Sequence, residues 1–265
     1  MTYERKPGEP LTVEFVPAAT VEPLVSVKES DSLALARTQM ELHDFSQLPV
    51  LRGPKAVGVV SWESIGRTLV RNPDATLKDC LDESWQTVRL TDELLPIIPR
   101  VNEHGYVVVL DGRDHVRGIV TGADLGELLA GVAGPFLEFE TIENVLREIV
   151  TKLKLANLLS VDLIKAVLPK SDKPADRIAQ DFTFGELRQI ICSEKVWPAL
   201  QSSYDRKSIL EHLDDAVRTR NLLMHFRTLA EKDIDAISRL PSLRKVMVDV
   251  RDGLKDNCIT GTAAL

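Results

Sequence analysis

The chain has 265 residues, 44% of them hydrophobic and 28% charged, with a formal net charge of −7 at pH 7. This composition is that of a soluble globular protein, and the length suffices for two domains that each bury a core. No apolar run approaches the roughly 20 residues that a membrane-spanning helix needs, and the mixed charges of MTYERKPGEPLTVEF are not those of a secretory signal, so we expect a cytoplasmic location.

Cysteine spacing and charge distribution argue against several classes of protein. Cys80, Cys192 and Cys258 are widely spaced, and none has a second Cys or a His at metal-ligand spacing, so neither a disulfide framework nor a metal site is indicated. Residues 1–135 hold 13 Lys and Arg against 20 Asp and Glu, whereas residues 136–255 hold 20 against 19. The acidity therefore belongs to the first half, and the nearly neutral second half offers no broad basic surface for nucleic acid.

The first half alternates short β-branched runs with short helical patterns. Strands are predicted by LVSV at 24–27, LPVL at 48–51, AVGVVS at 56–61, YVVVLD at 106–111 and VRGIVT at 116–121. This order predicts an α/β domain.

The α/β half also contains an internal repeat of about 60 residues. Copy one (residues 24–65) contains LVSVKESDSLALARTQM and LPVLRGPKAVGVVSWESI, and copy two (residues 85–125) contains WQTVRLTDELLPIIPRV and YVVVLDGRDHVRGIVTGADL. Each copy runs strand, acidic turn, helix, strand, tight turn, strand and helix. Two such units can bury each other's apolar faces, which one alone cannot do.

The repeat resembles a tandem pair of CBS domains, and GIVTGADL at 118–125 matches that family's signature of a strand, Thr, two residues and an Asp that opens a helix. Such pairs typically bind adenine nucleotides, AMP, ATP or similar, in the cleft between copies and act as regulatory modules. Thr121 and the helix N-terminus that follows it can bind phosphate through a hydroxyl, free N–H groups and the helix dipole. Asp124 can accept hydrogen bonds from both ribose hydroxyls.

The resemblance also implies an adenine pocket. It maps onto Thr87, Val88, Tyr106 and Val108 of copy two, and onto Ser26 at the corresponding position of copy one.

Copy one departs from the signature. Ser61 corresponds to Thr121, but Ser64 stands where Asp124 stands, and Glu63 is one position early, about 100° away around a helix. We therefore expect one good nucleotide site rather than two. The alternative is that both sites have decayed and the pair serves only as a dimerisation scaffold.

After Gly134 and Pro135 the strand patterns stop and helical periods take over. Helices are predicted by IENVLREIVTKLKLANLLSVDLIKAVL at 142–168, FGELRQIICSEKVWPALQ at 184–201 and ILEHLDDAVRTRNLLMHFRTLAEKDIDAI at 209–237. Residues 169–183 are predicted to be a polar loop, with Thr183 or Asp181 as the N-cap of the next helix. The small and polar residues 256–265 are expected to form a flexible tail.

The stretch AVRTRNLLMHF at 216–226 places two arginines, an asparagine and a histidine among leucines. In an ideal helix Arg218, Asn221 and His225 share one stripe, whereas Arg220 lies roughly 140° from His225. The two meet only if the Arg side chain wraps, the helix deforms, or a second copy of the chain brings its own motif alongside.

A noncatalytic interpretation of this stretch is also open. Arg218 and Arg220 could pair with Asp214, Asp215 or Glu231, and His225 could be a half-buried interface residue.

The sequence RNLLMH at 220–225 resembles the signature of the HEPN family of small all-helical domains, many of which are metal-independent ribonucleases. The upstream TFGELRQII helix and the connector VWPAL agree with this resemblance. Active members are homodimers whose two motifs face each other across the interface.

The resemblance implies a role for each residue of the motif. RNA carries its own nucleophile, the 2′-hydroxyl, so cleavage needs an acid/base near neutral pH and a cation for the developing charge on phosphorus. His225 would be the general acid/base and Arg220 would bind the scissile phosphate. Asn221 would orient the His or a phosphate oxygen, and Arg218 would hold an adjacent phosphate.

Together these patterns predict an α+β multidomain protein. Residues 1–135 would form the tandem CBS module and residues 136–255 an all-α HEPN-like helical bundle. We expect a homodimeric, nucleotide-regulated endoribonuclease that needs no metal, whose partners are RNA, an adenine nucleotide and a second copy of itself, with no membrane or DNA. The alternative is a noncatalytic nucleotide sensor whose helical domain binds a partner.

Overall fold

The structure is a computed structural model that describes residues 10–20, 22–82, 84–225 and 227–260, with the backbone alone for 255–260. The chain divides into two compact units, Met1–Gly131 and Val132–Leu265. The sequence placed the division four residues later, after residue 135. Among the described residues, none of the helices combines the length and the apolar character that a membrane crossing requires.

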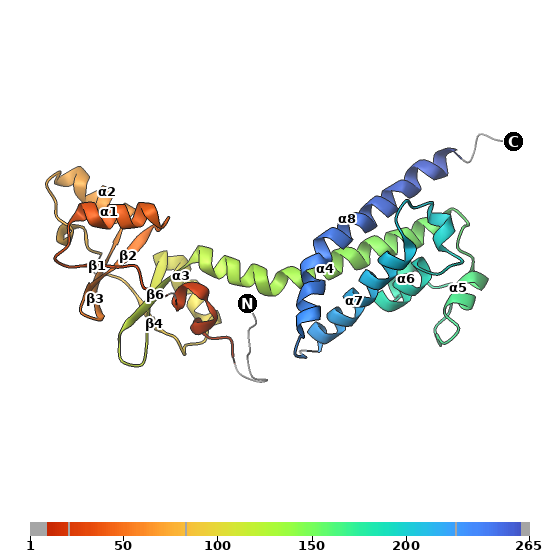
Figure 1. The fold of residues 1–265 in the computed structure, drawn as a ribbon, viewed down its shortest axis with the longest axis horizontal. Coiled ribbons are helices and arrows are strands. Elements are labelled where there is room, and N and C mark those ends of the chain that lie inside the picture. Colours follow the sequence, from red (N-terminus) through yellow and green to blue (C-terminus); the bar gives the residue numbers. More distant parts are fainter. Residues whose placement is uncertain (1–9, 21, 83, 226, 261–265) are drawn as a thin grey trace. The chain divides into compact units, whose positions relative to one another are not determined.

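The N-terminal unit contains two three-stranded sheets with the same order and directions (Figure 1). Their strands are β1 (Val27–Lys28), β2 (Gln47–Arg52) and β3 (Lys55–Ser61) in one sheet, and β4 (Thr87–Arg89), β5 (Tyr106–Leu110) and β6 (Val116–Thr121) in the other. In each sheet the first pair of strands is parallel and the second pair is antiparallel. The strand predicted at 24–27 begins only at Val27, and the other four predicted strands are confirmed.

The two sheets match at the level of individual residue pairs. Val50 pairs with Gly58 in copy one as Val109 pairs with Gly118 in copy two, and the register shifts immediately after both valines. Equivalent positions can therefore be assigned from the register, and the internal repeat predicted from the sequence is confirmed.

Four helices cover the sheets, together with short 3₁₀ helices. The α-helices are α1 (Leu33–Leu42), α2 (Trp62–Arg71), α3 (Ile98–His104) and the first part of α4 (Gly122–Leu155); the 3₁₀ helices are η1 (Val13–Phe15), η2 (Pro17–Ala19), η3 (Lys78–Cys80) and η4 (Leu95–Ile97). Copy one buries Ala36, Met40 and Ile65 of its helices against its sheet. Copy two buries Ile97, Val101 and Leu125 in the same way.

Each copy completes its core with a segment from outside the copy. The segment after α2 contributes Ala75, Leu77 and Cys80 to the core of copy one. The segment before copy one contributes Val13, Val16 and Ala19 to the core of copy two. Neither copy buries its core fully without these segments, and the one that completes copy two comes from before copy one in the chain.

Glycines allow these segments to approach the sheets closely. A Cβ at Gly118 would lie 2.1 Å from the carbonyl oxygen of Ala18, which no side chain can tolerate. At the equivalent Gly58 a Cβ would lie 3.3 Å from Cβ of Leu81. Glycine is therefore a packing requirement at Gly118, whereas at Gly58 a Cβ would make a tight contact that a small shift of Leu81 could relieve.

The sheet faces that point away from the helices share a separate apolar cluster. Val59 of copy one is buried with Tyr106, Val108 and Val116 of copy two. The two copies therefore bury each other's apolar faces, as the repeat predicted.

The C-terminal unit is helical and has a single apolar core. It contains the rest of α4, then α5 (Val161–Val167), η5 (Ala179–Asp181), α6 (Phe184–Ile191), η6 (Trp197–Leu200), α7 (Arg206–Met224) and α8 (Glu231–Thr260). Within this unit α4, α7 and α8 run alongside one another (Figure 1), and ion pairs such as Arg244–Glu138, with Nε 2.9 Å from Oε2, join α8 to α4.

Helix ends in this unit differ from the sequence prediction. The pattern at 142–168 is broken because Asn157 takes a left-handed conformation, with φ of 58°, and Ser160 caps α5. Thr183 is the N-cap of α6, one of the two predicted candidates, and it forms a capping box with Glu186. Helix α8 continues to Thr260 and so includes the first five residues of the tail predicted at 256–265, whose flexibility stays a prediction, and 261–265 lie outside the described residues.

Candidate functional site

Four residues predicted for the nucleotide site share one face of the sheet of copy two. Thr87 pairs with Val108, and Tyr106 pairs with Thr121, and paired residues in a sheet point to the same side. Val88 lies on the opposite face, where it is buried in the core of copy two. Its side chain therefore cannot line an adenine pocket, and only its backbone remains available.

Thr121 and Asp124 form a closed turn where β6 meets α4. Oδ2 of Asp124 accepts hydrogen bonds from N of Thr121 at 2.7 Å and from its Oγ1 at 2.6 Å. Oδ1 of Asp124 has no hydrogen-bond partner among the described residues, so one carboxylate oxygen can accept from a ligand. The Thr121 hydroxyl already donates to Asp124, which leaves the helix N-terminus as the donor for an anion.

Tyr106 is held by a residue that the sequence analysis missed. Its hydroxyl donates to Oδ2 of Asp82 at 3.1 Å, and burial, with the charge and hydrogen bond of Asp82, raises the pKa of Tyr106 well above its ordinary value. The backbone of Asp82 also forms a two-bond bridge with Val59 of β3. Asp82 thus joins the two copies beside the candidate site; no spacing motif in the sequence points to it.

The equivalent position in copy one lacks a carboxylate. Ser61 and Ser64 form a capping box at the start of α2, in which each hydroxyl accepts from the other's backbone N–H. The Glu63 side chain is 80% exposed and pairs with Arg67, so it does not replace Asp124. Ser26 precedes β1 and is half-buried. Copy one therefore offers hydroxyls and a helix N-terminus but no carboxylate to accept from the ribose at the position of Asp124.

The RNLLMH motif lies at the C-terminal end of α7. Arg220 and Asn221 are helical, whereas His225 is the C-cap, with φ of −101° and ψ of 13°. Asn221 and His225 are exposed, and Nη1 of Arg220 donates to Oδ1 of Asn221 at 3.4 Å. Within the described part of the chain the His225 side chain has no hydrogen bond or ion pair. The structure thus joins Arg220 to Asn221, and no described contact joins either of them to His225.

Arg220 is directed toward α4 by Glu143. Its Nη2 lies 3.6 Å from Oε2 of Glu143, whose Oε1 is 2.5 Å from Nη2 of Arg147. The Glu143 side chain is only 12% exposed. The sequence suggested Asp214, Asp215 or Glu231 as partners of Arg220, and these are wrong for this residue.

Arg218 joins α7 to α8 and is not free to bind phosphate. Its Nη1 is 2.7 Å from Oδ1 of Asp215, as the noncatalytic interpretation expected, and its Nε is 3.2 Å from Oδ1 of Asp233. Asp233 is 2% exposed and also accepts from N of Ala230 at 2.9 Å. These two ion pairs give Arg218 a structural role at the α7–α8 contact, and its predicted contact with an adjacent phosphate stays a prediction.

Residues 18–70 match the family model of the CBS domain. The N-terminal half of the chain therefore contains a CBS domain, and its two matched sheets have the α/β fold of a CBS pair. No curated protein sequence is a significant match to the chain.

Solved CBS structures are similar to the N-terminal half. A CBS domain-containing protein of unknown function from Bacillus anthracis strain Ames Ancestor is 17% identical with a TM-score of 0.41, covering 46% of this chain and 94% of that one. The CBS pair of protein MJ0100, in complex with 5′-methylthioadenosine and S-adenosyl-L-methionine, is 19% identical with a TM-score of 0.41, covering 46% and 98%. CBSX2 in complex with AMP is 20% identical with a TM-score of 0.39, covering 46% and 98%.

Proposed function

We propose that copy two binds an adenine nucleotide and that the helical unit is the effector that this nucleotide regulates. The observation that carries the first part is the unused Oδ1 of Asp124, in the first turn of α4 and next to the sheet face of Thr87 and Tyr106. The carboxylate oxygen can accept hydrogen bonds from hydroxyl groups of a ligand, and the helix N-terminus beside it favours an anionic group. A nucleoside phosphate carries both, in its ribose and its phosphate.

In this proposal each part of the nucleotide has a partner of matching chemistry. The phosphate takes the N–H groups and dipole at the start of α4, the ribose donates to Asp124, and the adenine lies beside Thr87 and the ring of Tyr106. The Val108 side chain, predicted for this pocket, is 0% exposed in the apolar cluster shared with copy one and offers the adenine no surface. Because Tyr106 already donates to Asp82, it contributes a ring wall rather than a donor. AMP, ATP and S-adenosyl-L-methionine are the probes to use first.

The test is a calorimetric titration of the full chain with these probes. We expect Asp124→Asn to weaken binding about tenfold, since it removes a charge-assisted hydrogen bond. Glu127→Gln is the matched control, because Glu127 is exposed on the same helix. Wild type that binds no probe, or Asp124→Asn that binds as well as wild type, contradicts the proposal.

For the effector we propose metal-independent cleavage of RNA by a homodimer. What supports this is the exposed His225 one residue after α7, whose side chain has no ion pair or hydrogen bond with any described residue, together with the neighbouring Arg220 and Asn221. His225 would take the proton of the 2′-hydroxyl and Arg220 would neutralise the phosphate. Since Arg220 is directed toward Glu143, an Arg and a His from different copies would share one phosphate. The 2′-oxygen would attack phosphorus as the bond to the 5′-oxygen breaks, and the protonated His225 would return the proton to that oxygen, leaving a 2′,3′-cyclic phosphate and a 5′-hydroxyl.

Labelled RNA incubated with the protein in EDTA tests this activity. We expect cleavage by wild type that His225→Ala abolishes and His212→Ala retains, since His212 is on the same helix with its ring nitrogen 2.8 Å from the Ser208 carbonyl oxygen. Equal inactivity of wild type and His225→Ala, with and without AMP, ATP or NAD, makes the helical unit a noncatalytic partner-binding domain instead.

Regulation requires that the nucleotide bind two arrangements of the protein with different affinity. Helix α4 carries Asp124 in its first turn and Glu143 further along, so it is the element through which nucleotide binding would reach Arg220. Cleavage measured with and without saturating nucleotide tests this coupling, and Asp124→Asn should remove the difference.

A further inference from the structure

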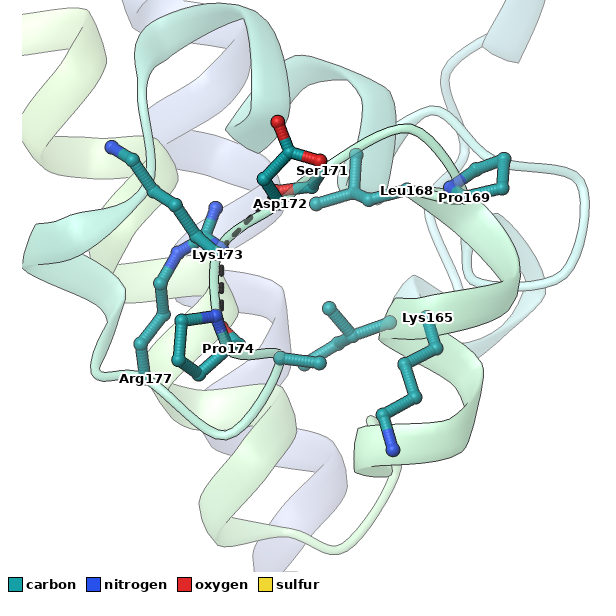
Figure 2. A pocket seen from close by; sticks show the side chains of 10 residues that line it. Lys165, Leu168, Pro169, Ser171, Asp172, Lys173, Pro174 and Arg177 are labelled. Atoms are coloured by element: carbon teal, nitrogen blue, oxygen red, sulfur yellow. Dashed lines mark hydrogen bonds between the residues drawn. The ribbon is translucent and has the colours of Figure 1, made fainter.

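The helical unit contains a hollow that neither proposed activity uses. It has a volume of about 350 Å³ and lies between α5 and the loop 168–177 (Figure 2). The RNLLMH motif is on α7, which does not line it. Binding sites for small molecules generally begin at roughly 300 Å³, so the hollow has the size of a small ligand site.

Half of the residues that line the hollow are apolar. Ile164 and Leu168 line it from α5 and the residue after it, and Pro169, Pro174 and Ala175 line it from the loop. Burial of an apolar ligand body against such a wall is favourable in proportion to the area removed from water. The proline rings also restrict the backbone, which reduces the entropy lost when a ligand orders the loop.

The loop is fixed by an ion pair beneath it. The Arg177 side chain is 6% exposed, and its Nη2 lies 2.5 Å from Oε1 of Glu186. Its Nη1 donates to Oγ of Ser171 at 3.3 Å and to the carbonyl oxygen of Pro174 at 3.1 Å. On the other side, Nε2 of Gln189 donates to the carbonyl oxygen of Val167 at 2.7 Å. Both sides of the hollow are thus tied to α6, so its shape exists before a ligand arrives.

The rim carries an excess of positive charge. Lys165 and Lys173 lie on opposite sides of the hollow, and neither has an ion pair among the described residues (Figure 2). Asp172 offsets one of them, and Glu186 neutralises Arg177. In Figure 2 both amino groups point away from the hollow, and their long, flexible stems would have to swing back to reach a ligand that enters.

We propose that this hollow binds a small organic anion, with an apolar body against Ile164 and Leu168 and a carboxylate or phosphate group between Lys165 and Lys173. An uncharged apolar ligand would leave the two amino groups without a partner, and an inorganic anion would make no contact with the apolar side of the hollow. The site is therefore selective for ligands that combine both features.

The experiment is a titration of the full chain, followed by ligand-observed NMR, with benzoate, phenyl phosphate, neutral benzamide and inorganic phosphate. We expect benzoate or phenyl phosphate to bind at least about tenfold more tightly than benzamide and inorganic phosphate. Whichever of the two binds more tightly identifies the anionic group. The double variant Lys165→Gln with Lys173→Gln should weaken that binding by about tenfold or more.

Lys170→Gln is the matched control, because Lys170 is an exposed lysine of the same loop that does not line the hollow. It should bind as wild type does. All three are exposed lysines, so circular dichroism should show an unchanged fold. The proposal is overturned if no probe binds, if benzamide binds as tightly as the aromatic anions, if inorganic phosphate binds as tightly as phenyl phosphate, or if the double variant binds as Lys170→Gln does.

Discussion

Nη2 of Arg220 on α7 lies 3.6 Å from Oε2 of Glu143 on α4, and the other oxygen of the same carboxylate pairs with Arg147. One carboxylate therefore faces two guanidinium groups in a largely buried position. A phosphate that binds Arg220 must compete with Glu143 or displace it, because two anions beside one cation repel each other.

Glu143→Gln should therefore bind RNA more tightly than wild type, by about tenfold, since both Arg220 and Arg147 lose their neutralising charge. Fluorescence anisotropy with a labelled RNA at one fixed salt concentration measures the affinity. Arg220→Gln should show the opposite change.

Glu148→Gln is the control for this prediction. It lies on the same helix and loses an ion pair with Arg251, with Nη1 3.0 Å from Oε2, without touching the motif. Its RNA affinity should equal that of wild type. Weaker binding by Glu143→Gln would mean that the carboxylate positions Arg220 rather than competing for it.

A second nucleotide site should appear if copy one receives the missing carboxylate. Ser64 is equivalent to Asp124, and an acidic residue in the first turn of α2 also favours the helix. With AMP as the titrant, Ser64→Asp should raise the calorimetric stoichiometry from one to two molecules per chain. Glu63→Gln, which removes a nearby exposed carboxylate, is the control and should leave the stoichiometry at one molecule of AMP per chain. An unchanged stoichiometry in Ser64→Asp would show that more than this residue is missing.

Gly118→Ala should destabilise the N-terminal unit by about 3 kcal/mol, because its Cβ would press on the Ala18 carbonyl oxygen and force the leading segment away from the core. Gly66→Ala is the contrasting variant. Gly66 lies in the exposed middle of α2 with open space around it, so Ala should stabilise by roughly 1 kcal/mol. Urea unfolding followed by circular dichroism measures both. Equal stability of the two variants is the result that contradicts this packing.

The sequence was sufficient for features that depend on local pattern. Alternating apolar residues and glycines located β2, β3, β5 and β6, and the capping preference of Thr183 located the start of α6. The repeat was visible because both copies place Gly, an apolar residue, Val and Ser or Thr at the same register. Thr121 and Asp124 were singled out by the resemblance of GIVTGADL to the CBS signature, and their role in nucleotide binding stays a prediction.

Features that depend on distant partners were not visible. Arg218 has acidic residues at helical spacing on α7, and nothing in the sequence indicates that the buried Asp233 of the next helix would also bind it. Asp82 is one of many acidic residues, and only the folded pair brings it to Tyr106. The interruption at Asn157 was missed because a helical apolar period continues on both sides of it. Propensity cannot decide such cases, because tertiary packing overrides it.

The acid sensitivity of the helical unit should depend on Glu186. Burial raises the pKa of this carboxyl, but hydrogen bonds from N of Thr183 and from Arg177 and Ser171 outweigh burial and lower the pKa to about 2. The folded pKa thus lies below the unfolded value of about 4.3. The stabilisation from this group is complete above the unfolded pKa and is lost as the pH falls from about 4.3 to about 2.

Urea unfolding of wild type and Glu186→Gln at several pH values tests this. Near pH 6 Glu186→Gln should be less stable by about 3 kcal/mol, since it leaves the buried Arg177 without its counter-ion. The difference should shrink toward pH 2, because wild type then loses the same charge. Glu194→Gln, an 82% exposed partner of Arg206, should follow the wild-type profile throughout. Parallel profiles for wild type and Glu186→Gln would mean that the Arg177 pair does not set the acid response.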